Sequence, residues 1–139
     1  MTRLVVDASV IIAALLPDEP YNQAARAVLQ SSLPSECMTS SLMRHEVVNA
    51  LWQAVRARRL KRESALLVLQ EFENLQFLVR DAPCVEILKL TEALNRPATY
   101  DTSYLALAQA EKIPLITADK RLYNALKRRF KWLRWVENP

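Results

Sequence analysis

The chain has 139 residues, of which 51% are hydrophobic and 24% charged, as expected for one globular domain with a substantial core. It contains no glycine, which excludes glycine-rich phosphate loops, the GxGxxG dinucleotide turn and the GxSxG nucleophile elbow. One histidine and two cysteines are too few for His-rich or Cys₄ zinc sites, so carboxylates must carry most of any catalytic chemistry. The net charge of +4 is mildly basic.

Short apolar segments alternate with helical patterns along the chain, which predicts an α/β domain with a parallel sheet, spanning residues 1–139. Ser41 is the predicted N-cap of the longest helix. The predicted strands are 4–6, 37–38, 77–79, 114–117 and 132–136. The predicted helices are 10–16, 21–31, 41–60, a segment around 66–72, 85–95, 100–111 and 122–130.

The apolar N-terminal stretch, residues 4–16, resembles a signal peptide in composition only. Asp7 interrupts it, no clear cleavage site follows, and it is too short to span a bilayer, so we expect a cytoplasmic protein without a membrane partner. Apolar neighbours predict that Cys37 and Cys84 are buried, reduced thiols. All three tryptophans, Trp52, Trp132 and Trp135, are expected in the core.

Cations gather in two segments that contain no acidic residue. Each could be a solvated helix end or a surface for a polyanion. The first segment contains Arg56, Arg58, Arg59, Lys61 and Arg62. The second contains Lys120, Arg121, Lys127, Arg128, Arg129, Lys131 and Arg134.

Four acids occupy positions where functional carboxylates could meet. Asp7 and Asp119 follow predicted strands, and ligands of open α/β sheets bind at the carboxyl ends of strands. Asp101 begins a predicted helix, and Glu46 lies early in another. Each acid also has a local explanation, as a helix cap, a turn residue or a solvated side chain. Gathered together, they would repel one another and would need protons or a hard cation such as Mg²⁺, which prefers oxygen ligands.

Four segments, 5–10, 45–51, 100–108 and 115–119, resemble in order and spacing the PIN-domain ribonucleases, most closely the VapC-type toxins of toxin–antitoxin pairs. The resemblance implies a three-layer fold with a five-stranded parallel sheet in the order 3-2-1-4-5 and helices on both faces. It also implies cleavage of single-stranded or structured RNA. The acids that match the family's Mg²⁺- or Mn²⁺-binding pocket are Asp7, Glu46, Asp101 and Asp119.

Further positions match supporting residues of that family. Ser9 and Thr117 match residues that support the pocket by hydrogen bonds, and Asn49 matches a frequent polar neighbour of the helix glutamate. Relatives form homodimers and are inhibited by a small VapB-like antitoxin. They carry glycine near Arg59, Asn95 and Lys112, where this chain has none, so the turns must be built differently.

The sequence thus predicts two-metal hydrolysis of RNA phosphodiesters. Asp7, Asp101 and Asp119 would hold the principal ion, and Glu46 would hold a second ion or orient the attacking water. Lys120 and Arg121 would offset charge on the phosphate. Two alternatives stay open: a non-catalytic RNA- or partner-binding module, and a phosphoryl-accepting α/β domain.

Overall fold

The computed structural model describes residues 3–139, in which five strands form one parallel sheet. The order β3-β2-β1-β4-β5 confirms the predicted topology, and each strand lies within one or two residues of its predicted position. The strands are β1 (Leu4–Val6), β2 (Cys37–Thr39), β3 (Leu78–Val79), β4 (Leu115–Thr117) and β5 (Leu133–Trp135).

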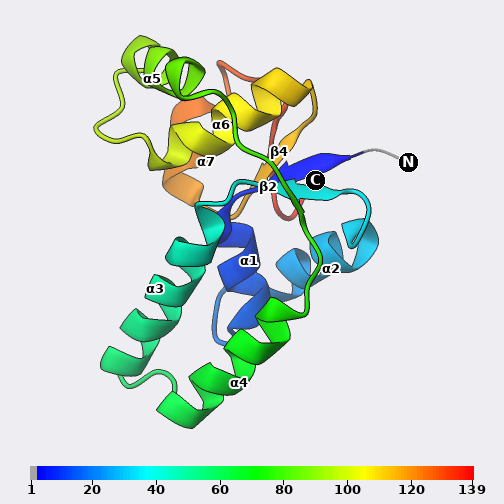
Figure 1. Cartoon of the computed structure of the whole chain (residues 1–139), viewed down its shortest axis with the longest axis vertical. Helices are drawn as coiled ribbons and strands as arrows, with labels where there is room; N and C mark the ends of the chain where they lie inside the picture. The colour runs from blue at the N-terminus through cyan, green and yellow to red at the C-terminus, as the bar shows by residue number, and fades with distance from the viewer. Residues whose placement is uncertain (1–2) are drawn as a thin grey trace.

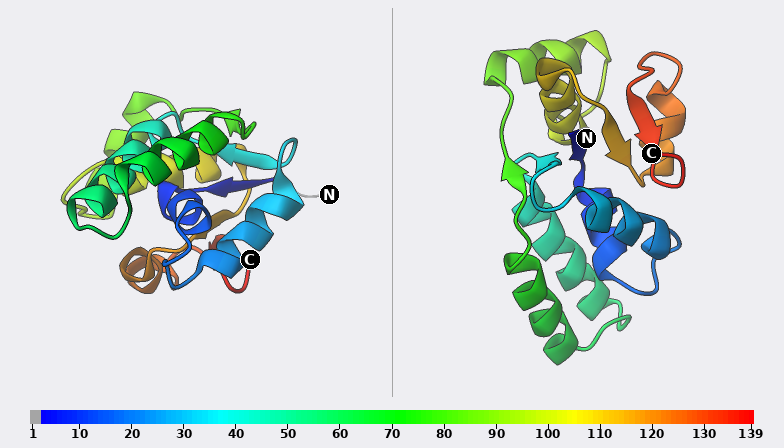
Figure 2. Two further views of the ribbon diagram at one scale, coloured as in Figure 1. Left: turned by 90° about the horizontal axis from the view of Figure 1, so that it is seen from below. Right: turned by 90° about the vertical axis from the view of Figure 1, so that its right-hand side faces the viewer.

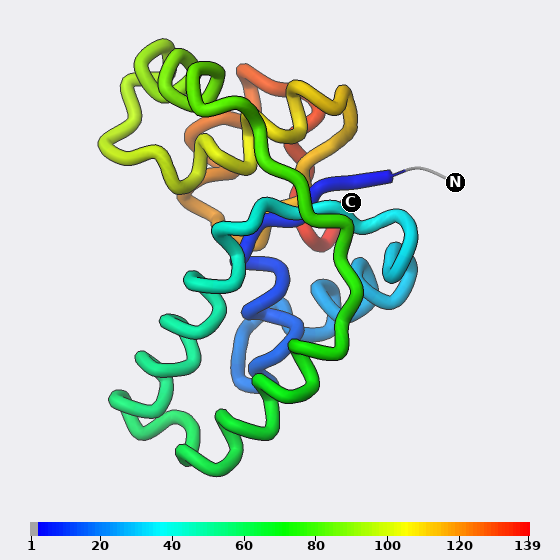
Figure 3. The backbone as a smooth tube through the Cα atoms, in the orientation of Figure 1, coloured from blue at the N-terminus to red at the C-terminus, as the bar shows by residue number. Residues whose placement is uncertain are grey.

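Helices cover both faces of this sheet, which gives the predicted three layers. The first four helices lie on one side and the last three on the other (Figure 1). Two of them, α3 and α4, extend beyond the sheet as an antiparallel pair (Figures 2 and 3). The helices found within residues 3–139 are α1 (Ala8–Leu15), α2 (Asn22–Ser32), α3 (Met43–Arg56), α4 (Arg62–Glu73), α5 (Cys84–Ala93), α6 (Tyr100–Glu111) and α7 (Lys120–Leu126).

The winding of the chain creates a crevice beside β1. From β1 the chain steps outward to β2 and β3, and it then returns to place β4 and β5 on the other side of β1. Strands β1 and β4 are therefore neighbours whose connections leave toward opposite faces, the arrangement at which open α/β sheets bind ligands. Because Val6 pairs with Ile116, Asp7 lies at the same level as the end of β4.

The core explains why the apolar N-terminal stretch is part of the domain. Val5 and Val6 of β1 and Ile11 of α1 are fully buried, and they belong to the same cluster as Leu105 of α6 and Leu115 of β4. Burying such a side chain contributes roughly 1.5–3 kcal/mol, so this stretch stabilises the sheet. Among the residues in the structure, no helix is long and apolar enough to cross a membrane.

Three local predictions were wrong. Helix α3 begins at Met43 and ends at Arg56 without a side-chain cap, because both side-chain and backbone groups of Ser41 bond to Asp81 instead. Trp52 lies on α3, and 55% of it is exposed. Cys84 is exposed at the start of α5, whereas Cys37 is buried as predicted.

Without glycine, three helices end on other residues in the left-handed conformation. The φ angles of Arg58, Asn95 and Lys112 are 60°, 50° and 57°, at the ends of α3, α5 and α6. This is the helix-terminal position that glycine usually occupies, since a Cβ atom makes the left-handed conformation costly. Asparagine tolerates this conformation better than lysine or arginine.

We expect Lys112→Gly to stabilise the protein by about 0.5–1 kcal/mol, because glycine removes the Cβ cost of the left-handed turn. The free energy of unfolding in urea measures this change. Lys127→Gly is the matched control, because Lys127 ends α7 with a φ angle of −59° and gains nothing from glycine. Equal effects of the two substitutions would mean that the Lys112 turn carries no such cost.

Candidate active site

Asp7 is the most deeply buried acid of the candidate site, with 5% of its surface exposed. It follows β1 and caps α1, accepting a hydrogen bond from the Val10 backbone N–H at 3.3 Å. The hydroxyls of Ser9 and Thr117 also donate to its carboxylate, the latter at 2.6 Å. Burial raises the pKa of Asp7 to about 7, although these hydrogen bonds lower it. The carboxylate therefore lies among neutral donors, and no cation of residues 3–139 forms an ion pair with it.

Ser9 and Thr117 join β1 to β4 around this carboxylate. Their hydroxyl oxygens lie 3.3 Å apart. Ser9 Oγ accepts from the Ala118 N–H at 2.9 Å, and Thr117 Oγ1 accepts from the Asp119 N–H at 3.0 Å. Both side chains thus connect Asp7 with the segment that carries Asp119.

Glu46 reaches the site from the first turn of α3. The Tyr104 hydroxyl, on α6, donates to Glu46 Oε1 at 2.6 Å. Burial raises the pKa of Glu46, and so does the nearby charge of Asp101, while the Tyr104 hydrogen bond lowers it. Only 2% of Tyr104 is exposed, so this tyrosine packs in the core and presents its hydroxyl to the site.

Asp101 lies in the first turn of α6 and forms an ion pair that the sequence did not predict. The guanidinium of Arg96 lies 3.2 Å from Asp101 Oδ2. Arg96 follows the left-handed turn at Asn95, and its backbone N–H bonds to the Thr91 carbonyl at 3.1 Å. The Thr91 and Thr102 hydroxyls also bond to each other, which joins α5 to α6 beside this pair. No motif reveals Arg96, because its role depends on the loop conformation.

Asp119 caps α7, accepting from the backbone N–H groups of Arg121 at 3.0 Å and Leu122 at 3.2 Å. The local explanation as a helix cap therefore holds for Asp119, and Asp7, in the turn from β1 to α1, also caps a helix. Lys120 and Arg121 are exposed in the first turn of α7. Asn49 is exposed one turn after Glu46 and makes no side-chain hydrogen bond within residues 3–139.

The four acids lie around one edge of the sheet but are not equally close. Asp101 raises the pKa of both Asp7 and Glu46 through its charge, so these three acids influence one another. Asp119 is connected to Asp7 through Thr117. In the part of the chain that the structure describes, no three such side chains are already close enough to share an ion. All four candidate ligands are carboxylates, and the buried Asp7 has no ion-pair partner among residues 3–139, which fits a hard divalent cation.

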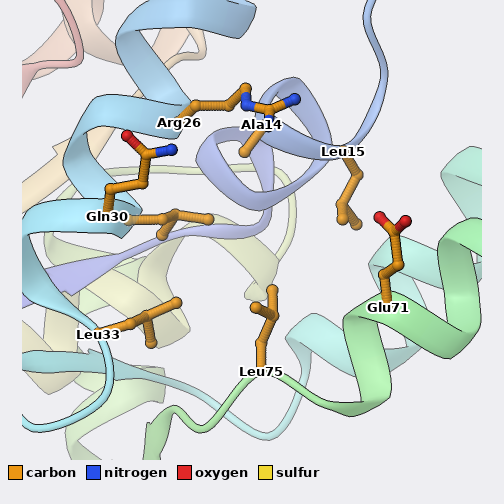
Figure 4. A pocket seen from close by; sticks show the side chains of 8 residues that line it. Ala14, Leu15, Arg26, Gln30, Leu33, Glu71 and Leu75 are labelled. Atoms are coloured by element: carbon orange, nitrogen blue, oxygen red, sulfur yellow. The ribbon is translucent and has the colours of Figure 1, made fainter.

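A separate apolar groove lies between α1, α2 and α4, with a volume of about 340 Å³ (Figure 4). In Figure 4 the side chains of Leu15, Leu33 and Leu75 lie around it, and Arg26 and Glu71 lie at its margins. None of the four acids lines this groove, so it is not part of the carboxylate site. Its lining residues are Ala14, Leu15, Arg26, Leu29, Gln30, Leu33, Glu71 and Leu75.

Fold and site together define an α/β domain with carboxylates at the carboxyl edge of a parallel sheet. They lie beside the crevice between β1 and β4, whose connections leave toward opposite faces. The PIN domain family model matches residues 4–127. Ribonuclease VapC3 of Pyrobaculum aerophilum is 36% identical over 123 residues, covering 86% of this chain and 92% of that protein. Ribonuclease VapC1 of Mycobacterium tuberculosis is 32% identical over 127 residues, covering 88% and 90%. The chain therefore belongs to the PIN-domain family, among the VapC ribonucleases.

Solved structures show the same fold. The crystal structure of PAE2754 from Pyrobaculum aerophilum matches with a TM-score of 0.67 and 26% identity, covering 98% of this chain and 92% of that one. VapC20 of Mycobacterium tuberculosis, described as a sarcin-ricin loop cleaving toxin, matches with a TM-score of 0.64 and 19% identity, covering 94% and 98%. FitAcB from Neisseria gonorrhoeae gives a TM-score of 0.63 at 17% identity, covering 95% of each chain.

Proposed function

We propose that this chain is a metal-dependent endoribonuclease that cleaves single-stranded or structured RNA, and that it is the toxin of a toxin–antitoxin pair. The observation that carries the proposal is the buried Asp7 carboxylate at the β1–β4 crevice, with Glu46, Asp101 and Asp119 around the same edge. Family membership supports RNA as the substrate. A module that only bound RNA would gain nothing from carboxylates where phosphate must approach.

The three aspartates and the glutamate have different roles in this proposal. Asp7, Asp101 and Asp119 would hold the principal Mg²⁺ or Mn²⁺ ion, and Glu46 would hold a second ion or orient the attacking water. Bound divalent ions supply activation of water and stabilisation of the charged phosphate. Ser9 and Thr117 fix the Asp7 carboxylate by hydrogen bonds, and so determine which of its lone pairs remain available.

Two further residues control how the acids are presented. Arg96 pairs with Asp101 through Oδ2 at 3.2 Å, so it offsets part of the charge of this carboxylate and leaves Oδ1 available to a cation. Tyr104 holds Glu46 through a hydroxyl that stays protonated, because burial and the carboxylate both raise the pKa of the tyrosine. Glu46 therefore keeps one orientation relative to α6.

Metal-dependent cleavage is the direct test of this function. We expect the purified protein to cut a single-stranded RNA into fragments with 5′-phosphate and 3′-hydroxyl ends in Mg²⁺ or Mn²⁺, and EDTA to stop the reaction. Gel analysis of end-labelled RNA measures both properties. RNA binding without cleavage in either metal would favour the non-catalytic alternative, whereas a mass increase after incubation with a small phosphodonor would favour the phosphoryl-accepting one.

The same proposal includes a small antitoxin of the VapB type and a homodimer of this chain. The relatives named VapC and the toxin VapC20 support the antitoxin. A reading frame for a small DNA-binding protein immediately upstream of this gene would support a toxin over a solitary nuclease. Copurification of that product with this chain would test the pair directly.

A further inference from the structure

The seven cations of residues 120–134 form what we call the α7–β5 basic segment. All seven side chains belong to exposed residues, and none forms an ion pair within residues 3–139. No acidic residue lies between Asp119 and Glu137. The segment therefore presents an uncompensated positive charge. Its members are Lys120, Arg121, Lys127, Arg128, Arg129, Lys131 and Arg134.

Helix stability explains only part of this charge. Cations near a helix C-terminus are favourable, which accounts for Lys127 and its neighbours at the end of α7. Lys120 and Arg121 lie at the opposite end, where the helix dipole disfavours positive charge. Mutual repulsion of so many like charges also destabilises the folded chain. A partner that supplies negative charge gives these residues a role.

The segment begins at the carboxylate site. Asp119 caps α7, so Lys120 and Arg121 directly follow one of the four acids. At 1.5 Å per residue, the other end of α7 lies roughly 10 Å away, a span of a few nucleotides. The segment then leads into β5, which pairs with β4 and is the last strand at one edge of the sheet. Arg134 is exposed on this edge strand.

The other basic cluster, residues 56–62, differs from this segment in its ion pairs and in its distance from the four acids. Arg59 pairs with Asp18 at 2.9 Å and with Glu19 at 3.2 Å, so part of its charge is already compensated. Glu46 lies at the start of α3 and Arg56 at its end, ten residues or roughly 15 Å further along the helix. In Figure 1 this end of α3 points away from the sheet. This cluster is therefore a natural control for the effect of net charge.

We propose that the α7–β5 basic segment binds the phosphate backbone of the RNA strand as it leaves the carboxylate site, without reading its sequence. The inference rests on the proposed ribonuclease function. The four acids repel RNA, so most of the affinity for a substrate must come from cations nearby. Single-stranded nucleic acids bind in this way to basic surfaces that follow their backbone.

RNA binding in EDTA tests this inference without cleavage. We expect the triple variant Arg128→Ala, Arg129→Ala, Lys131→Ala to bind a fluorescein-labelled single-stranded RNA about tenfold more weakly at low salt. The slope of log K against log salt should fall by about 2, since each lost phosphate contact contributes about 0.7. The control variant Arg56→Ala, Lys61→Ala, Arg62→Ala removes the same charge and should change affinity less than about threefold, with the slope unchanged. Circular dichroism verifies folding of both variants.

Cleavage measured in parallel separates this inference from the proposed function. With Mg²⁺ we expect the Arg128/Arg129/Lys131 variant to have a raised KM and an unchanged kcat. The lost phosphate contacts stabilise the bound RNA and the transition state equally, so their loss weakens substrate binding without slowing the chemical step. If the wild-type protein cleaves RNA but this variant binds as tightly as the wild type, the inference is wrong and the function stands. Equal weakening of both variants would also overturn it, as an effect of net charge alone. If the wild-type protein does not cleave but the binding difference holds, only the ribonuclease function fails.

Discussion

Asp7→Asn is expected to reduce RNA cleavage by about a thousandfold or more while leaving the fold intact. Asparagine has nearly the same shape, and its carbonyl oxygen can still accept the Val10 N–H that caps α1. The substitution removes the negative charge that a divalent cation needs as a ligand, and with it the stabilisation of charge in the transition state. Single-turnover cleavage of RNA in Mg²⁺ measures the loss, and thermal unfolding verifies the fold.

Asp18→Asn is the matched control for this experiment. Asp18 is half-exposed, pairs with Arg59 and follows the end of α1, away from the acids. We expect the Asp18→Asn variant to cleave RNA at the wild-type rate. If the Asp7 variant cleaved RNA within about tenfold of the wild-type rate, Asp7 would not be an essential ligand.

The position of Asp7 and Asp119 could be predicted because each comes just after a buried parallel strand. A residue in that place must lie at the carboxyl edge of the sheet. Val5 and Val6, like Leu115 and Ile116, belong to short apolar runs that are typical of buried strands, and parallel strands end at the same edge. That these two strands are neighbours follows from the family resemblance rather than from the residues themselves. The register of Val6 with Ile116 then aligns the two segments, and no sequence pattern specifies it.

Other features of the site depend on geometry that periodicity does not encode. Arg96 reaches Asp101 because Asn95 takes a left-handed conformation, and a side chain's direction after such a turn cannot be inferred from spacing. Tyr104 packs in the core and also donates its hydroxyl to Glu46, a double role that helical spacing does not reveal. Ser41 has the composition of a helix cap, but tertiary contact with Asp81 prevails over that local preference.

The stability of the metal-free protein is expected to fall as the pH rises from about 4 to 7. Burial raises the pKa of Asp7 from 3.8 to about 7, so in this range the folded chain retains a proton that the unfolded chain has lost. The shift corresponds to roughly 4 kcal/mol of lost stability above pH 7. A divalent cation binds the ionised carboxylate, so Mn²⁺ should stabilise the fold much more at pH 8 than at pH 5. Urea unfolding at several pH values, with Mn²⁺ or EDTA, measures both effects.

Comparison with Asp7→Asn isolates this contribution from the other acids. Asp18 and Asp81 have lowered pKa values, because Arg59 and the Ser41 and Ser40 groups bond to them, so their stabilising contribution is lost as the pH falls. Glu46, with a raised pKa, adds to the effect of Asp7. The wild-type and Asp7→Asn proteins share these contributions, which therefore cancel when their free energies of unfolding are subtracted. The asparagine variant should therefore become the more stable protein in EDTA above pH 7 and should lose most of the response to Mn²⁺. A difference that does not vary between pH 4 and 8 would show that Asp7 is ionised throughout and that its burial is already compensated.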